Sequence, residues 1–288
     1  MSDPPALSRR DFTALSLAAG VTAAMGSRAA TSHDATIAEV EVRTPAGICD
    51  ATLAHPQGRG QWPAVILFVD AFGLRPTMND MARRLAQDGY TVLVPNPYYR
   101  STKAPGLPPG FNFSNPDDRQ KLAALRAPLT AEAVAQDAIA YMSYLDSQPS
   151  VKKHAKAGVV GYCMGGPMTM RAAAALPDRI GAGASLHGGG LVSDKPDSPH
   201  LLVPRIRAQY YFGVAANDDA SDPQAKTKLR EAFDAAGLQM KIEVYEGCLH
   251  GWCIKDMPPS PEGKQIYNEA QAERAWNELI ALYKRALV

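Results

Sequence analysis

Gly-Tyr-Cys-Met-Gly-Gly, at residues 161–166, is the stretch that decides the fold of this chain. An apolar run at residues 157–160 precedes it and is typical of a buried strand, and residues 167–176 follow with the composition of a helix. A strand, a G-x-C-x-G turn and a helix in this order predict a sharp turn that holds the side chain of Cys163 clear of the backbone. Gly161 and Gly165 allow the strand and the helix to approach closely. The stretch therefore indicates Cys163 as a nucleophile, against the alternative of a small buried side chain in a Gly-rich loop.

Apolar runs in the rest of the chain alternate between strand patterns and helix patterns. Continuous apolar segments are typical of strands buried on both faces, and alternating ones are typical of half-buried strands. We expect an α/β fold with a mainly parallel sheet, an N-terminal hairpin and helices on both faces, and a long Pro/Gly-rich loop at about residues 98–116. The predicted strands are 36–43, 48–54, 63–69, 90–94, 157–160, 181–187, 207–214 and 241–245, and the predicted helices are 77–87, 131–147, 167–176, 223–236 and 261–287.

Composition excludes several classes of protein. The 288 residues are 46% hydrophobic and 20% charged, as in an ordinary globular protein. The net charge of +1 gives no basic surface for nucleic acid or for an anionic membrane. Four cysteines in a chain of this length exclude a disulfide scaffold, and no spacing of Cys and His resembles a zinc site. We expect no nucleic-acid partner, no metal and no cofactor, and a monomer or a small homo-oligomer.

Residues 1–30 have the pattern of a twin-arginine export signal. Ser-Arg-Arg-Asp-Phe at 8–12 is followed by a weakly apolar run at 15–25 and by Ser-Arg-Ala at 27–29, a small-residue cleavage site. The alternative is an ordinary amphipathic helix. The apolar run is too short for a permanent membrane span. We therefore expect a periplasmic or secreted protein in which residues 36–288 form a single domain.

A cysteine nucleophile needs a base and a group that orients the base. His250 follows the last predicted strand, and Asp218 follows the strand before it. The order Cys163, Asp218, His250 is the nucleophile, acid, histidine order of α/β-hydrolases. Asp219 is the alternative acid. Either aspartate could instead cap a turn, and His250 could be a surface histidine.

Two backbone N–H groups are expected to bind the oxyanion that forms when Cys163 attacks a carbonyl carbon. One belongs to Met164, at the start of the helix that follows the turn. The other should come from the loop after the first buried parallel strand, at residues 70–73, where we assign Ala71. Asp70 lies beside this site and opposes negative charge there, so it must cap a turn or have a special role.

Taken together, these motifs resemble the dienelactone hydrolase (carboxymethylenebutenolidase) family of α/β-hydrolases, from about residue 36 to the C-terminus. The resemblance implies the α/β-hydrolase fold. It implies that Asp70 takes the place of a glutamate that hydrogen-bonds the resting thiol, one methylene shorter here. It also implies that Arg100 holds a substrate carboxylate, with Tyr99, His187 and Trp252 among the substrate-binding residues. The residues that carry the resemblance are 70–73 (acid-x-Phe-Gly), 96–100 (Asn-Pro-Tyr-Tyr-Arg), 161–166, 218 and 247–252 (Gly-x-x-His-Gly-Trp).

Two positions depart from the pattern of the family. Ile254 stands where members that cleave dienelactone carry a second carboxylate-binding arginine, with Lys255 next to it. His187 stands where an aromatic residue lines the pocket of the family. Both departures weaken an assignment to dienelactone itself and leave the prediction of a hydrolase intact.

The sequence therefore predicts hydrolysis of a small-molecule ester or lactone through a thioester on Cys163. One alternative is a non-catalytic or redox-sensitive periplasmic binding protein on the same fold, although the complete triad and the lack of a C-x-x-C pair argue against it. Another is an acyltransferase, in which a second substrate replaces water.

Overall fold

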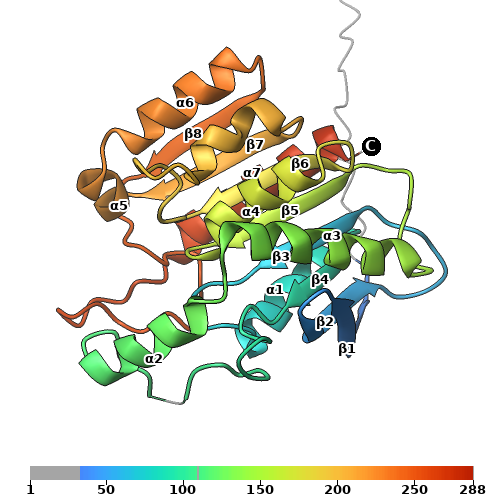
Figure 1. Ribbon diagram of the computed structural model, residues 1–288, viewed down its shortest axis with the longest axis horizontal. Coiled ribbons are helices and arrows are strands. Elements are labelled where there is room, and N and C mark those ends of the chain that lie inside the picture. Colours follow the sequence, from blue (N-terminus) through green and yellow to red (C-terminus); the bar gives the residue numbers. More distant parts are fainter. Residues whose placement is uncertain (1–32, 109, 288) are drawn as a thin grey trace, which may run out of the picture. The chain divides into compact units, whose positions relative to one another are not determined.

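Among residues 33–108 and 110–287, which the computed structural model describes, eight strands form one sheet in the order β1-β2-β4-β3-β5-β6-β7-β8 (Figure 1). Strands β3 to β8 pair in parallel, whereas β2 pairs in antiparallel with both β1 and β4. The predicted signal at residues 1–30 lies outside the described residues. The strands are β1 Ala35–Thr44, β2 Gly47–Pro56, β3 Ala64–Phe68, β4 Thr91–Pro95, β5 Ala157–Tyr162, β6 Ile180–Leu186, β7 Gln209–Ala215 and β8 Met240–Tyr245.

The strand order confirms the predicted α/β-hydrolase fold. Strands β1 and β2 form the expected N-terminal hairpin, in which Thr44 pairs with Gly47 across a tight turn. Gly47 has a φ of 133°, in a region that L side chains rarely adopt, so a glycine suits this turn. The parallel strands point their carboxyl ends to one edge of the sheet, where ligands bind in such folds.

Helices cover both faces of the sheet (Figure 1). Helices α3, α4 and α6 share one buried apolar layer with the sheet, and α1 and α7 share the other. In β3, Ile66 packs in the first layer and its neighbours Val65 and Leu67 pack in the second, which explains the continuous apolar run in the sequence. Among the described residues, no helix is both long and apolar enough to cross a membrane. The helices are α1 Pro76–Gln87, α2 Pro116–Arg126, α3 Ala131–Ser147, α4 Gly165–Ala175, the 3₁₀ helix η1 Pro199–Arg205, α5 Ala216–Ser221, α6 Ala225–Ala235 and α7 Glu269–Ala286.

Three helical segments differ from the sequence-based prediction. Helix α2 was not predicted, because its one buried residue, Leu122, leaves no apolar periodicity to detect. The six-residue helix α5 was not predicted either, because it has no buried residue. Asp218 therefore lies in a helical turn and not in the expected loop. The predicted helix at residues 261–287 was too long at its start, because Asn268 caps α7 by accepting a hydrogen bond from the backbone N–H of Gln271.

Candidate active site

The turn between β5 and α4 has the strained geometry that the sequence predicts. Cys163 has a φ of 52°, which is uncommon for a residue with a side chain. The backbone holds this conformation from both sides, since Cys163 donates its N–H to the carbonyl of Leu186 at 3.1 Å and accepts from the N–H of Gly166 at 3.0 Å. Local strain of this kind persists only where the surrounding structure imposes it, and it often marks a functional site.

Two glycines make the turn possible because backbone passes directly against them. A Cβ atom on Gly161 would lie 2.1 Å from the carbonyl oxygen of Gly165, and one on Gly165 would lie 2.3 Å from that of Phe68. Real Cβ atoms do not approach backbone this closely, so neither position tolerates a larger residue without movement of the strand or the helix. The spacing of small residues around Cys163 is therefore a packing requirement of β3, β5 and α4.

His250 and Asp218 meet at the carboxyl edge of the sheet. The Nδ1 atom of His250 lies 2.8 Å from Oδ2 of Asp218, and the backbone N–H of His250 donates to Oδ1 of Asn217 at 2.8 Å. Asp219 is engaged elsewhere, because both of its carboxylate oxygens lie 2.6 Å from Nζ of Lys226. Of the two aspartates that the sequence leaves open, the structure brings Asp218 to the imidazole.

The surroundings of His250 favour its protonated form. Burial alone lowers the pKa of the imidazole, but the hydrogen bonds and negative charges of Asp218 and Cys163 outweigh this effect and raise the pKa to about 10. Cys163 and His250 also line the same cavity. A cysteine beside a protonated imidazole has the electrostatic setting in which a thiolate forms.

The two predicted oxyanion donors lie at the rim of this cavity. Among the described residues, neither the N–H of Ala71 nor that of Met164 donates a hydrogen bond to another residue. Tyr98 donates its hydroxyl to the carbonyl of Ala71 at 2.7 Å and so holds the Ala71–Phe72 peptide, which follows the peptide that carries the N–H of Ala71. The next N–H, of Phe72, is occupied by Oδ1 of Asp70 at 2.9 Å. Two free donors at one cavity can bind a developing oxyanion.

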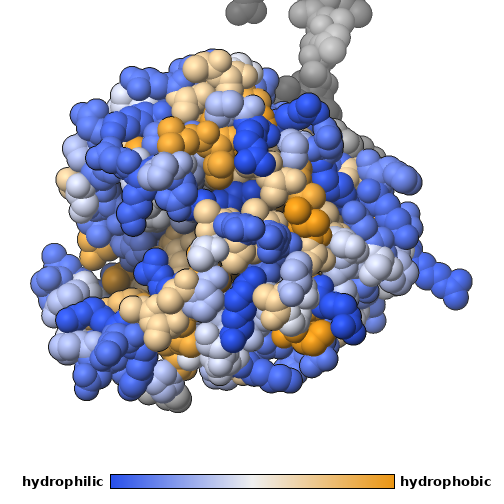
Figure 2. Space-filling view, in the orientation of Figure 1, coloured by the Kyte–Doolittle hydropathy of each residue, from blue (hydrophilic) through white to orange (hydrophobic). Residues whose placement is uncertain are grey.

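The cavity at Cys163 has a volume of about 450 Å³, within the range of small-molecule sites. One wall is apolar and is built by Phe72, Phe113, Leu122 and Met257. Phe113 packs edge-on against Phe72 with ring centroids 5.3 Å apart. The space-filling view shows hydrophobic surface next to the α2 region, at lower left (Figure 2). The apolar wall suits an alkyl or aryl portion of a substrate.

Asp70 does not contact the thiol, contrary to what the family resemblance implies. Its two carboxylate oxygens accept from Arg75 at 2.7 and 2.9 Å, and Arg75 also pairs with Asp256. These charged partners raise the pKa of the Arg75 guanidinium, although burial opposes them. Asp70 is one methylene shorter than glutamate and lies five residues before the arginine that holds it. It lines the cavity as part of a fixed ion pair.

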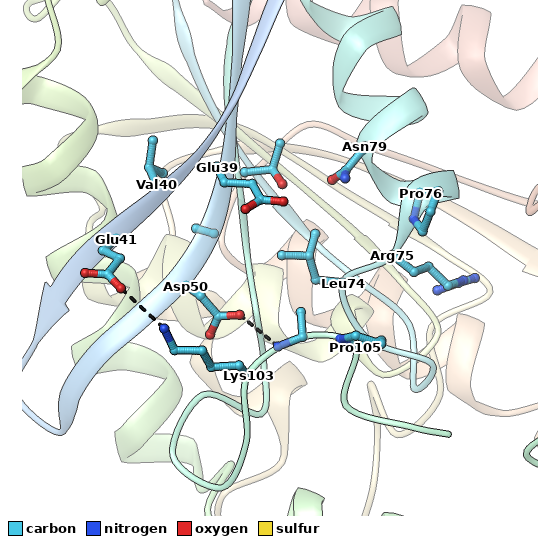
Figure 3. A pocket seen from close by; sticks show the side chains of 13 residues that line it. Glu39, Val40, Glu41, Asp50, Leu74, Arg75, Pro76, Asn79, Lys103 and Pro105 are labelled. Carbon is cyan, nitrogen blue, oxygen red and sulfur yellow. Dashed lines mark hydrogen bonds and ion pairs between the residues drawn. The ribbon is translucent and has the colours of Figure 1, made fainter. Parts of the chain in front are cut away.

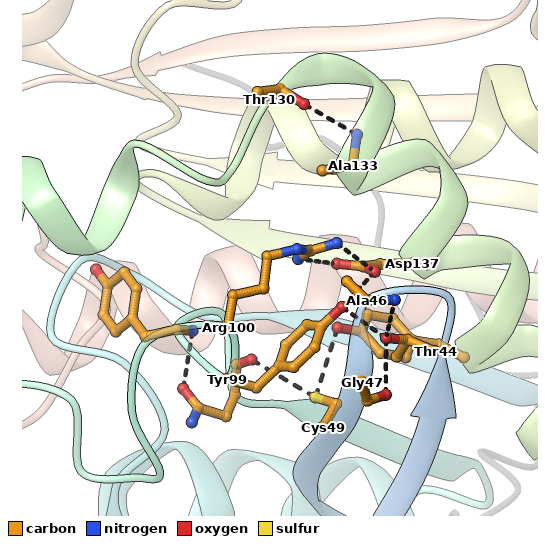
Figure 4. Close-up of polar contacts among 12 residues, drawn as sticks. Thr44, Ala46, Gly47, Cys49, Tyr99, Arg100, Thr130, Ala133 and Asp137 are labelled. Atoms are coloured by element: carbon orange, nitrogen blue, oxygen red, sulfur yellow. Dashed lines mark hydrogen bonds and ion pairs between the residues drawn. The ribbon is translucent and has the colours of Figure 1, made fainter.

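Arg100 and Tyr99 also lie away from the Cys163 cavity. The guanidinium of Arg100 donates to both carboxylate oxygens of Asp137, at 2.7 and 2.9 Å, and the hydroxyl of Tyr99 donates to the same carboxylate at 2.7 Å (Figure 4). Tyr99 also contacts the hydroxyl of Thr44. This network joins the N-terminal hairpin to α3 and engages the guanidinium of Arg100, whose role as the substrate anchor stays a prediction. The partner is Asp137, a buried carboxylate that the local motif does not contain.

His187 and Trp252 lie behind His250 and do not line the cavity. His187 is 1% exposed, and its ring contacts those of His250 and Trp252 edge-on, with centroids 4.8 and 5.4 Å apart. Trp252 is fully buried and stacks on Tyr245. Burial lowers the pKa of His187 well below its ordinary value, so this ring stays neutral. His187 packs directly against His250 and Trp252 packs against His187, and neither of the two lines the Cys163 cavity.

Other candidate sites hold none of this chemistry. A larger cavity of about 650 Å³ lies between the hairpin and the start of α1 (Figure 3). Two of its three carboxylates are engaged, since Glu41 lies 3.5 Å from Lys103 and Asp50 accepts from the N–H of Ala104 at 2.8 Å. Within residues 33–108 and 110–287, no group of three or more His, Cys, Asp or Glu side chains is arranged to hold a metal ion.

Arg126 is the arginine that the structure does place at the Cys163 cavity. The sequence analysis missed it because it lies at the end of α2, a helix without apolar periodicity. Phe72, Phe113 and Met257 were missed as pocket residues because they come from three separate loops. The one available signal was the Pro/Gly-rich composition of residues 98–116, which indicated a pocket wall without showing which side chain forms it.

Comparison with known proteins identifies the family of this chain. A Synechocystis sp. protein named as a carboxymethylenebutenolidase is 28% identical over 241 residues, which cover 82% of this chain and 91% of that protein. A Methylorubrum extorquens protein of the same name is 28% identical over 284 residues, or 95% and 91% of the two chains. A crystal structure from Klebsiella pneumoniae, named as a dienelactone hydrolase, has the same fold, with a TM-score of 0.72 at 22% identity, covering 87% of this chain and 99% of that one. The model of the dienelactone hydrolase family matches residues 49–287, and the chain therefore belongs to this family of carboxylic ester hydrolases.

Proposed function

We propose that this protein hydrolyses a carboxylic ester or lactone through a thioester on Cys163, with His250 as the base and Asp218 as the group that orients it. The observation that carries the proposal is the 2.8 Å contact between His250 Nδ1 and Asp218, in a histidine that shares one cavity with a cysteine held at a φ of 52°. Family membership supports hydrolysis of carboxylic esters, and the geometry supports the assignment of roles.

The first half-reaction acylates the cysteine. The thiolate of Cys163 attacks the carbonyl carbon and forms a C–S bond, and the carbonyl oxygen takes the negative charge. The N–H groups of Met164 and Ala71 bind this oxyanion. When the tetrahedral intermediate collapses, the C–O bond to the alcohol breaks and the imidazolium of His250 donates its proton to the leaving oxygen. An open-chain ester gives a thioester and a free alcohol. A lactone gives a single product, a thioester whose acyl chain carries the new hydroxyl group.

The second half-reaction restores the enzyme. With the sulfur acylated, the negative charge that helped to raise the pKa of His250 is gone, so the neutral imidazole can act as a base. It takes a proton from water while the water oxygen attacks the thioester carbon. The C–S bond then breaks, and the carboxylic acid leaves. Asp218 keeps the imidazole in one orientation through both steps.

The thioester is the feature that tests this proposal. We expect rapid-quench mixing of the mature protein with 4-nitrophenyl acetate to release a burst of nitrophenolate and to leave one acetyl group on the peptide that contains Cys163. Hydroxylamine should remove this group. Acetylation of serine or lysine instead, or no burst with reduced protein, would contradict the mechanism. Turnover that needs an added alcohol or amine would point to the acyltransferase.

We also propose that residues 1–30 direct export by the twin-arginine route, on the basis of the arginine pair at 9–10 and the apolar run after it. In a Gram-negative host, the full chain should reach the periplasmic fraction, and replacing both Arg9 and Arg10 with lysine should hold it in the cytoplasm. Arg28→Lys, outside the pair, is the matched control and should be exported. Equal export of the Arg9/Arg10 variant would refute the proposal.

A further inference from the structure

A second cavity adjoins the one at Cys163. It has a volume of about 410 Å³, and it shares four lining residues with the first cavity. Together the two exceed the space that a small lactone needs, since single pockets of about 300 Å³ already hold small ligands. The shared residues are Arg126, Met164, Gly189 and Gly190.

Two exposed glycines stand at the border of the two cavities, because Gly189 and Gly190 line both. A Cβ atom added to Gly189 or to Gly190 would meet nothing within 4 Å, so no neighbouring atom fills the space beside them. The border therefore carries no side chain at these two positions that would stand between a ligand at Cys163 and the second cavity.

Arg171, on α4, supplies a poorly compensated positive charge to the second cavity. Its side chain is 16% exposed, and its nearest carboxylate is that of Asp197, 3.8 Å away and 58% exposed. Arg75 and Arg100 are similarly buried, but each lies 2.7 Å from a carboxylate. Burial accordingly lowers the pKa of Arg171, whereas carboxylates raise the pKa of Arg75 and Arg100. A largely buried guanidinium whose one carboxylate partner lies 3.8 Å away is suited to bind an anion.

Further cations line the same space. Arg126 stands at the border of the two cavities and Lys195 lines the second, and no carboxylate of a described residue lies within 4 Å of either charged group. Three cations therefore face one exposed carboxylate, that of Asp197. The excess charge favours a ligand that carries a negative group.

We propose that the substrate is an elongated ester whose scissile carbonyl lies at Cys163 and whose distal carboxylate reaches past Gly189 and Gly190 into the adjoining cavity and binds Arg126 and Arg171. This inference rests on the hydrolase function proposed above and names its substrate class. The apolar wall of Phe72, Phe113 and Met257 takes the uncharged portion of the molecule. Arg126 and Arg171 thus determine specificity and do not take part in bond breaking.

The test compares esters that differ only in a terminal carboxylate. One series pairs the 4-nitrophenyl monoesters of succinic, glutaric and adipic acids with 4-nitrophenyl alkanoates of equal chain length. A second pair, 4-acetoxybenzoate and phenyl acetate, places the carboxylate on the leaving group. For at least one pair we expect kcat/KM of the carboxylate-bearing ester to exceed that of its neutral partner about 10-fold or more. Arg171→Gln and Arg126→Gln should each reduce this ratio about 10- to 100-fold, because a charge-assisted hydrogen bond is lost.

Arg230→Gln is the matched control, since it removes one positive charge from an exposed position of α6 that lines neither cavity. The inference would be overturned if the wild-type ratio is near one in every pair. It would also be overturned if the Arg171 and Arg126 variants keep a ratio as high as that of the Arg230 variant. If Arg171→Gln loses the preference for the anion and also has a lowered melting temperature, the loss could come from damage to the fold. Arg126→Gln then decides, because the side chain of Arg126 is exposed at the end of a helix and its replacement should leave the fold intact.

Labelling of the thiol separates failure of this inference from failure of the hydrolase proposal. If no ester is cleaved, the hydrolase proposal fails, and the rates at which 6-maleimidohexanoic acid and N-hexylmaleimide modify Cys163 still report on the anion site. We expect the acid to react faster in wild type and to lose this advantage in Arg171→Gln and in Arg126→Gln. Equal rates for the two reagents in wild type would show that the second cavity has no preference for an anion.

Discussion

Replacing Cys163 with alanine is expected to lower kcat/KM for a 4-nitrophenyl ester by at least ~10⁴-fold, because loss of a covalent nucleophile removes the whole acylation pathway. The fold should survive, since alanine is smaller than cysteine and keeps the same backbone preferences at the turn. The measurement is initial rates with reduced, mature protein, with the melting temperature recorded alongside. A variant that folds and retains a tenth of the activity would show that another group carries out the reaction.

The other three cysteines provide the control for this result. Burial raises the pKa of Cys49 to about 12, and it also raises those of Cys248 and Cys253, so these thiols stay protonated at neutral pH. Iodoacetamide should therefore modify Cys163 first and abolish activity with a single label. Cys253→Ala should be inactivated by the reagent at the wild-type rate. Inactivation that follows labelling of Cys49 or Cys248 would exclude Cys163 as the nucleophile.

Replacing Asp218 with asparagine should lower kcat by about 10²- to 10⁴-fold, while the same change at Asp219 should cost less than about 3-fold. An amide at position 218 presents the wrong hydrogen-bonding pattern to the imidazole and removes the charge that favours its protonated form. Asp219 contacts Lys226 instead of His250, so the two neighbours form a matched pair. Equal losses in the two variants would contradict the assignment of the acid.

The pH dependence of stability has a definite sign at this site. The pKa of His250 is raised from the ordinary value of 6.5 to about 10 by its partners, so the folded state binds this proton more tightly than the unfolded state does. The stabilisation is complete below about pH 6.5 and is lost as the pH rises towards 10. Between these values the melting temperature of wild type should fall further than that of His250→Gln. Parallel curves for the two proteins would show that His250 has no raised pKa in the fold.

The elements that local patterns predicted well are those whose signals lie within a few residues. The buried strands appear as continuous apolar runs because each strand packs against helices on both faces. The Cys163 turn appears as glycines in the sequence, because backbone approaches within 2.1 to 2.3 Å of where their side chains would be. Asp218 and His250 could be found because each follows a strand directly, and parallel strands end at the same edge.

Two charged side chains that the sequence analysis assigned to the site, Arg100 and Asp70, have partners elsewhere in the chain. Arg100 follows the expected motif, but the carboxylate of Asp137, 37 residues further on, holds it in a buried network. Asp70 follows its motif too, and Arg75, which also pairs with Asp256, holds it in an ion pair. A long charged side chain can reach in several directions, so its sequence position does not determine which pocket it enters.

The amino-acid sequence by itself determined the α/β-hydrolase fold, the strained turn at Cys163 and the positions of Cys163, Asp218 and His250 after successive strands, because these depend on apolar periodicity and on short-range steric limits. Only the tertiary structure decided which aspartate meets His250, that Arg100 pairs with Asp137, and that Arg126 and Arg171 line two adjoining cavities. The physical reason is that the energy of a partly buried charge depends on the nearest opposite charge. That neighbour comes from distant segments, which the sheet and its helices bring together only when the whole chain has folded.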